Sequence, residues 1–487
     1  PDAVNDVLRW ASVIGRDVDF AVLADLVDTD EDDVLEALDV AIDARLIEET
    51  GAGRYRFVHA LVRSTLLEEV RTTRRVRMHL KIGESIERHR PGDVTALAHH
   101  FAEAATTGGL DRALDYNARA GAQALDRAAF DEAAGFYRRA LDLLEDTETE
   151  DPVLRIDLLI GLGTAQRSAG GGGHDETLLD AADRAHGLGD GIRMADALLA
   201  TYRGWGSVAF AVNEPLVGRI RDALDLLGDD GEALARRVLL LVTLTLELLN
   251  DPETDPWSLL DEARVDADRL GSPVLSARVI GARLHVRSDL SSRVGQVDAY
   301  DLDAYEQDID AVEVETARLD AEDPWLSSFG PTHRAQWALR RGDVDAAAQG
   351  IEELGAQAAR SGRILHNWTA TFFAAGARLY TGDHTDAEAL IERAADLGRS
   401  AGEPDVEQYW GNQMIFLRRQ QGRPEEMLDI VKAVVAAEPI GWGEWCAALA
   451  LLQSEAGHID DATTSFDRAV TAHGTPDHRP FVPTAAT

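Results

Sequence analysis

His59 and Arg63 lie one helical turn apart at the predicted start of a helix, and their types suggest anion binding. The preceding segment 54–57 (RYRF) alternates polar and apolar residues, as a half-buried strand does. A helix N-terminus presents unpaired N–H groups and a partial positive charge, so it attracts anions. An imidazole and a guanidinium at this point could bind a phosphate. The structural alternative is that His59 caps the helix and Arg63 pairs with a nearby carboxylate.

A second group, His99, His100 and Glu103, contains types that bind metal, with His99 and Glu103 one turn apart. Zinc sites in proteins use three or four protein ligands, and no third ligand is evident here. The chain has a single cysteine, Cys446, which excludes a cysteine metal site and a disulfide framework. We therefore expect these residues to serve packing, and we predict no metal site.

Catalytic patterns are missing from the sequence. A phosphate-binding loop, G-x-x-x-x-G-K-[ST], requires a lysine after a glycine. The two lysines, Lys81 and Lys432, follow Leu80 and Val431, and the run AGGGG at 169–173 has no lysine after it. No Ser/His/Asp, Cys/His or paired-carboxylate set stands out. We predict that the chain is not an enzyme, holds no cofactor and hydrolyses no ATP by itself.

The 487 residues carry a formal net charge of −39. Such a surface repels phosphate backbones and anionic lipids, which disfavours nucleic acid and membranes as partners. The basic run 71–90 is the exception, and we expect it to dock on an acidic face of the same protein or on another module. The apolar run 238–249 is too short to span a bilayer and contains Glu247, which indicates a buried helix. With no signal peptide evident and a lone cysteine, we expect a cytoplasmic location.

The C-terminal part, 331–472, repeats one pattern. A turn glycine is followed by a small, a large and a small apolar residue at five, nine and twelve positions, and the glycines are spaced by 40, 40 and 35 residues. The sets are Gly342/Ala347/Ile351/Leu354, Gly382/Ala387/Ile391/Ala394, Gly422/Met427/Val431/Val434 and Gly457/Ala462/Phe466/Ala469. Seven residues before each glycine lie Ala335, Ala375, Ile415 and Ala450. Each repeat is thus a helix, a tight turn and a second helix. The spacing is close to the period of about 34 residues found in tetratricopeptide arrays, which predicts that the helix pairs stack into a superhelix.

The rest of the chain is also mostly helical. Residues 1–91 contain three amphipathic helices, a two-stranded hairpin and two further helices, which predicts a winged-helix adaptor. Residues 92–475 continue as helix pairs, with the repeat offsets recurring from Ala128 and, more loosely, from Gly173. Residues 476–487 are rich in proline and read as a linker or frayed end. The predicted fold class is all-α: a winged helix with a small β-hairpin, then a tetratricopeptide-like superhelix.

Five tryptophans fall in the regular repeats, and most should fill gaps between stacked pairs. One or two could instead line the concave groove, where such arrays bind extended peptides or small effectors. The candidates are Trp337, Trp368 and Trp410.

Most of positions 1–470 resembles one group of large bacterial regulators, the signal-transduction ATPases with numerous domains (STAND) of actinobacteria. Three passages carry the resemblance: WASVIGRDVDFAVLADLVDTDEDDVLEALDVAIDARLIEE with RYRFVHALVRSTLLEEV; ALAHHFAEA with ALDYNARAGAQALDRAAFDEAAGFYRRAL; and RSAGEPDVEQYWGNQMIFLRRQQGRPEEM. In this group a nucleotide-binding module precedes a winged helix and a tetratricopeptide-like superhelix. Members carry a C-terminal LuxR-type DNA-binding domain, as in maltose-activator-like regulators, or an N-terminal class III adenylate cyclase.

The resemblance implies that a parent protein binds ATP and ADP through a module outside this chain. It also implies that the stretch containing His59 and Arg63 lies beside that module, because a winged-helix histidine of related ATPases contacts the nucleotide phosphate. The sequence departs from the family at Ser64, where an acidic residue is usual, and at Leu67, where an aromatic is usual.

The sequence therefore favours a sensor and transmission region of an ATP-dependent signalling or transcriptional regulator. Its expected partners are the nucleotide-binding module of the same polypeptide and a protein or small effector held by the superhelix. The alternative is a stand-alone scaffold for protein–protein interaction, without nucleotide coupling. The gene sequence upstream of Pro1 separates the two: a nucleotide-binding module favours the regulator, and a start codon favours the scaffold.

Overall fold

The computed structural model of the chain describes residues 2–145, 151–170, 172–201, 212–249, 251, 254–294, 302–317, 326, 329–403, 406–437 and 442–472. The predicted tail, 476–487, lies outside these residues. The described part contains 24 α-helices and one three-stranded sheet, which confirms the predicted all-α class with a small β-hairpin. The chain divides into two compact units, Pro1–Leu162 and Gly163–Thr487.

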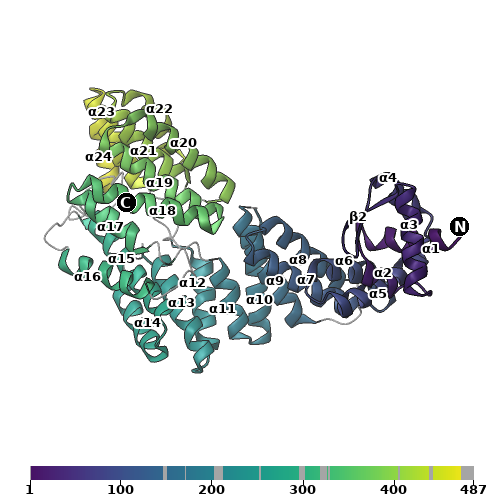
Figure 1. Ribbon diagram of the computed structural model, residues 1–487. Helices are drawn as coiled ribbons and strands as arrows, with labels where there is room; N and C mark the ends of the chain where they lie inside the picture. Colours follow the sequence, from purple (N-terminus) through teal and green to yellow (C-terminus); the bar gives the residue numbers. More distant parts are fainter. Residues whose placement is uncertain are drawn as a thin grey trace. The chain divides into compact units, whose positions relative to one another are not determined.

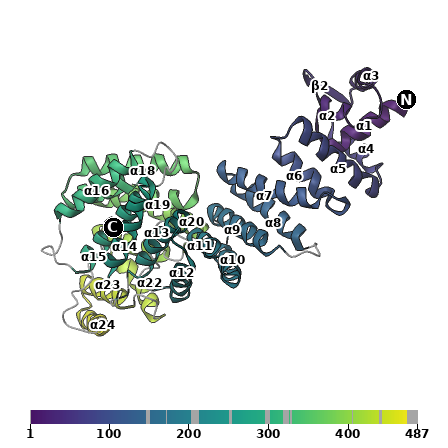
Figure 2. The same cartoon turned by 90° about the horizontal axis from the view of Figure 1, so that it is seen from below.

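The first unit begins with helices gathered around the small sheet, the purple region of Figure 1, and continues with helices that lie side by side in chain order (Figure 2). Its elements are α1 (Asp2–Ile14), β1 (Asp17–Asp19), α2 (Phe20–Ala24), α3 (Glu31–Asp43), β2 (Ile47–Gly51), β3 (Arg54–Phe57), α4 (Ala60–Glu68), α5 (Thr72–His89), α6 (Val94–Glu103), the 3₁₀ turn η1 (Ala105–Thr107), α7 (Leu110–Asp126), α8 (Phe130–Glu145) and α9 (Pro152–Ala169), which crosses the boundary between the units.

The sheet has the order β1-β3-β2, and both pairings are antiparallel. The hairpin of β2 and β3 was predicted, but β1 was not, because three residues with two aspartates give no strand pattern. β1 is held at the sheet edge by its pairing of Asp17 with Arg56, whose Nε donates to the Asp17 carboxylate at 2.6 Å. Side-chain oxygens of Asp19 and Asp30 accept backbone N–H groups at the starts of α2 and α3, which explains why these helices begin there.

The predicted domain boundary at residue 91 falls inside the first compact unit. The reason is close packing of α5 on α6: a Cβ on Gly83 would lie 2.8 Å from the buried ring of Phe101. Tyr116 on α7 reaches back to α5 and donates its hydroxyl to Glu87 at 2.7 Å. The helix pairs therefore continue directly from the N-terminal region.

The described residues of the second unit are almost entirely helical. The helices are α10 (His174–Leu188), α11 (Gly191–Ala200), α12 (Glu214–Leu226), α13 (Gly231–Glu247), α14 (Pro256–Leu270), α15 (Pro273–Val294), α16 (Leu302–Thr316), α17 (Phe329–Arg340), α18 (Val344–Ser361), α19 (Ile364–Thr381), α20 (His384–Ala401), α21 (Val406–Gln420), α22 (Glu425–Ala436), α23 (Trp442–Glu455) and α24 (Ile459–Ala472). Among the described residues, no helix is both long and apolar enough to cross a membrane.

The four repeat glycines occupy the turns of α17–α18, α19–α20, α21–α22 and α23–α24, as predicted. All have positive φ, between 69° and 81°, a region that favours glycine. The small and large residues that follow them are buried or half-buried, except Phe466, which is 47% exposed. Phe466 lies on α24, the last described helix, and no later pair covers it in the described part of the chain.

Ala128 occupies the glycine position of the earlier repeat, between α7 and α8, and adopts a φ of 56°. Its backbone hydrogen bonds match those of the glycine turns: Ala129 N–H donates to Ala124 at 2.9 Å, as Asp343 N–H donates to Ala338 at 2.8 Å. The sequence pattern therefore set the turn geometry even where the glycine is missing.

Because an alanine Cβ is strained in this conformation, Ala128→Gly is expected to stabilise the chain by about 1 kcal/mol. Urea denaturation would measure the gain. Gly457→Ala is the matched control: its φ is 81° and a Cβ would have no neighbour within 4 Å, so a loss of similar size is expected from backbone strain alone. A loss of stability in Ala128→Gly would contradict the strain argument.

Residues far apart in the second unit come into contact. A Cβ on Gly170, after α9, would lie closer than 3.0 Å to the carbonyl oxygen of Ser400 on α20, and 3.2 Å from Ile364 on α19. His174 at the start of α10 faces Gly402, the residue after α20. The helices of this unit thus turn back so that its beginning meets α19 and α20.

Candidate functional site

The predicted anion site lies where β3 leads into α4. His59 is the N-cap residue of α4, is exposed, and makes no side-chain capping bond. The sequence interpretation in which its imidazole caps the helix is therefore not what the structure shows. Among the residues of α4 none is fully buried, and Leu61 is 80% exposed.

Arg63 lies on the same helix, one turn from His59, but its guanidinium turns toward the core. Its Nε donates to the carbonyl oxygen of Ser12 at 3.0 Å. Ser12 belongs to the last turn of α1, whose carbonyl groups lack partners within the helix, so a cationic side chain is well suited to that place. This contact uses the Nε atom, and anion binding by Arg63 stays a prediction.

The basic run at 71–90 forms α5 together with the residues before and after it, Arg71 and Arg90. At its C-terminal end, Arg88 and His89 contact the carboxylate of Asp25, next to α2. Burial raises the pKa of Asp25, but the hydrogen bonds from Ser85 and Arg88 lower it. The net effect is a pKa below the usual value of an aspartate. This end of the run therefore docks on an acidic residue of the same chain, as expected. Arg71 and Arg74, at the other end, are exposed.

Of the three groove candidates, two lie in the core. Trp337 is 8% exposed and Trp368 is 3% exposed, so neither presents its ring to a ligand in this structure. Trp410 is half-buried, and its Nε1 donates to Glu392 at 3.1 Å. Trp410 stays the candidate for a contact with a bound partner.

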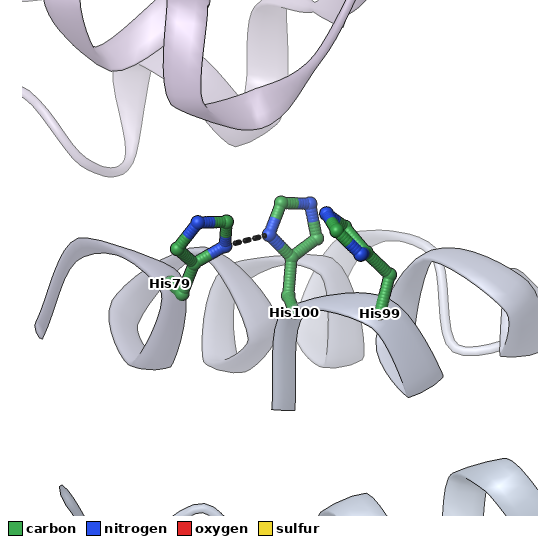
Figure 3. A group of neighbouring side chains, drawn as sticks. All are labelled: His79, His99 and His100. Carbon is green, nitrogen blue, oxygen red and sulfur yellow. Dashed lines mark hydrogen bonds between the residues drawn. The ribbon is translucent and has the colours of Figure 1, made fainter. Parts of the chain in front are cut away.

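The group His99, His100 and Glu103 gains a third imidazole from another helix. His79 on α5 lies beside His99 and His100 on α6, with one nitrogen of each ring within 4.8 Å of the others (Figure 3). The Nδ1 atoms of His79 and His100 are 2.9 Å apart and share a hydrogen bond. His79 and His100 are buried and His99 is exposed. Sequence reasoning missed His79 because it lies 20 residues before His99 on a separate helix.

The surroundings keep these imidazoles neutral. Burial lowers the pKa of His79 to about 4 and that of His100 to about 3. His99 is exposed as a whole residue, but partial removal of its ring from water also lowers its pKa, against the attraction of the Glu103 carboxylate. The positive charge of Arg63 contributes to all three decreases, so this arginine lies close to the histidine group as well as to α1. Neutral imidazoles retain a lone pair for a metal ion.

Comparison with known proteins gives similarities in structure. No protein-family model matches the chain, and no curated protein sequence matches it. A STAND protein with a tetratricopeptide repeat sensor from Pyrococcus horikoshii is 12% identical, with a TM-score of 0.41, over 97% of this chain and 64% of that protein. Aspartyl phosphate phosphatase F from Bacillus subtilis is 10% identical, with a TM-score of 0.40, over 76% of this chain and 96% of its own. The human IFIT1 dimer with PPP-AAAA is 12% identical, with a TM-score of 0.39, over 82% of this chain and 91% of that chain. The chain thus spans 64% of the length of the Pyrococcus protein.

Proposed function

We propose that this chain is the sensor and transmission region of an ATP-dependent signalling or transcriptional regulator. Residues 1–91 would be a winged-helix adaptor that packs on a nucleotide-binding module of the same polypeptide. The observation that carries this proposal is that α4 is attached to the N-terminal helices on one side and exposed on the other. Arg63 attaches the helix to α1, while His59 and Leu61 are exposed at its first turn.

An exposed imidazole beside a highly exposed leucine suits contact with another module rather than with water. Val58, immediately before His59, is also 36% exposed, so the apolar surface continues along the chain. In this proposal, His59 contacts the phosphate of ADP held by the neighbouring module, and the apolar side chains pack on that module. Arg63 sets the orientation of α4 through its bond to Ser12.

The helix pairs that follow would bind a protein or a small effector in the cytoplasm. Trp410 is the described tryptophan with exposed surface among the three candidates. Binding that favours one packing of the helices would shift the population of adaptor positions, and so the nucleotide state of the parent. The chain itself would perform no catalysis, because no phosphate-binding loop or catalytic set is present in its sequence.

The test is His59→Ala in the full-length parent protein, with the affinity for ADP measured by calorimetry. Loss of a hydrogen bond to a charged phosphate should weaken ADP binding by about tenfold or more. His458→Ala, an exposed histidine beside α24, is the matched control and should leave ADP affinity unchanged. Equal ADP affinity in the parent and in His59→Ala would favour the alternative, a scaffold without nucleotide coupling.

A further inference from the structure

We propose that His79, His99 and His100 form a binding site for a divalent transition metal, with Zn²⁺ the preferred ion and one coordination position open to solvent. The proposal is independent of the nucleotide coupling proposed above, because none of the three histidines is assigned a role in that coupling. It reverses the expectation of no metal site, which depended on the lack of a third ligand near His99 and Glu103.

The first argument is the composition and spacing of the group. Three imidazoles are a ligand set used by zinc sites that keep a water at the fourth position. Zn–N bonds of about 2.0–2.1 Å in a tetrahedron place ligand nitrogens about 3.3 Å apart. The Nδ1 atoms of His79 and His100, at 2.9 Å, need to separate by a few tenths of an ångström. One ligand nitrogen of each of the three rings lies within 4.8 Å of the others, so a common metal ion would require the rings to move closer together.

The second argument is the hydrogen bonding of His100. The backbone of Ile14, at the end of α1, also acts on the His100 ring and partly offsets the decrease of its pKa that burial causes. With Nδ1 directed at a metal ion, the nitrogen left for Ile14 would be Nε2. Zinc-bound histidines commonly donate their second N–H to a backbone carbonyl, which fixes the tautomer and directs the other nitrogen at the metal.

The third argument concerns the proton between the two buried rings. One proton lies between the Nδ1 atoms of His79 and His100, and the tautomers of the two rings decide which ring donates it. A metal ion would take the place of this proton. His79 would then carry its proton on Nε2, and both Nδ1 lone pairs would face the ion. Figure 3 shows the three rings side by side on the same face of α5 and α6.

The charges around the three histidines determine which total charge a bound metal ion and its fourth ligand should have. The guanidinium groups of Arg63, Arg75 and Arg139 act on the histidines, and the Glu103 carboxylate acts on His99. This positive surrounding opposes a bare cation and favours an anion, such as hydroxide or chloride, at the open position. Hard ions such as Mg²⁺ and Ca²⁺ prefer oxygen ligands and should not bind these nitrogens.

The test uses the complete chain without a histidine tag, freed of metal by a chelator and titrated with Co²⁺ and Zn²⁺. We expect one equivalent of Co²⁺ to give the visible absorption of a tetrahedral site, and Zn²⁺ to displace it. Zn²⁺ should also raise the melting temperature of the chain. Mg²⁺ at the same concentration should do neither.

His99→Ala is the critical variant, because its side chain is exposed and its loss should not prevent folding. We expect it to weaken Zn²⁺ binding by at least about 100-fold, since loss of outer-shell partners alone costs 10–100-fold. His458→Ala, the matched control outside the group, should bind Zn²⁺ like the unaltered chain. Absence of the Co²⁺ absorption, or equal Zn²⁺ affinity in His99→Ala and the unaltered chain, would overturn the proposal.

Discussion

Phe101→Ala is expected to lower the free energy of unfolding of the first compact unit by about 3–5 kcal/mol. The Phe101 ring is 0% exposed and stacks on Tyr116 with ring centroids 5.5 Å apart. One edge of the ring packs so closely on Gly83 that a Cβ there would lie 2.8 Å away. Alanine would leave a cavity between α5, α6 and α7, and neighbouring side chains could fill it only by moving these helices.

Urea denaturation of the full chain, combined with hydrogen exchange of amides in α5–α7, would measure this loss. Leu61→Ala is the matched control: this leucine is 80% exposed, so its removal should change stability by less than about 0.5 kcal/mol. A loss below about 1 kcal/mol for Phe101→Ala would show that the packing of α5 on α6 is looser than the structure indicates.

Gly161→Ala and Gly135→Ala make the same chemical change in adjacent helices, and their effects are expected to have opposite signs. A Cβ on Gly161 in α9 would lie closer than 3.0 Å to the ring of Tyr137. That ring cannot retreat, because Gly121 in α7 contacts its other side, where a Cβ would lie 2.8 Å away. Overpacking of this kind typically costs about 1–3 kcal/mol.

Gly135 in α8 has no atom within 4 Å of an added Cβ, so alanine there should stabilise the helix by up to about 1 kcal/mol. Urea denaturation of both variants gives the comparison. A second variant identifies the cause: Tyr137→Leu, which removes the ring, should restore part of the stability lost in Gly161→Ala. Equal effects of the two glycine substitutions would contradict the role of Gly161 as the space for Tyr137.

Several parts of the fold could be predicted from the sequence because they depend on local interactions. The turn glycines were recognised from their spacing, and the aspartates at residues 19 and 30 start helices because their side chains accept nearby N–H groups. β3 of the predicted hairpin follows from the alternation of polar and apolar residues at 54–57. β1 could not be predicted, since its three residues become a strand only through pairing with β3.

The candidate site was less predictable, because its geometry depends on contacts between distant residues. Arg63 bonds through Nε to Ser12 at the end of α1, 51 residues earlier, and no pattern in the sequence near Arg63 indicates this contact. Trp337 and Trp368 could not be assigned to core or surface from their spacing alone. His79 shares no sequence pattern with His99 and His100, and its role depends on how α5 packs on α6.

The contact between Gly170 and Ser400 has a consequence for how the second unit could respond to a ligand. These residues are 230 positions apart, yet they are in van der Waals contact. This contact limits how far the succession of helices between them can open or close. A ligand that moved the helices between Gly170 and Ser400 apart would have to separate these two residues, which leave no space between them for a side chain. Packed contacts of this type are made or broken rather than stretched, so the curvature would change in one step between two states.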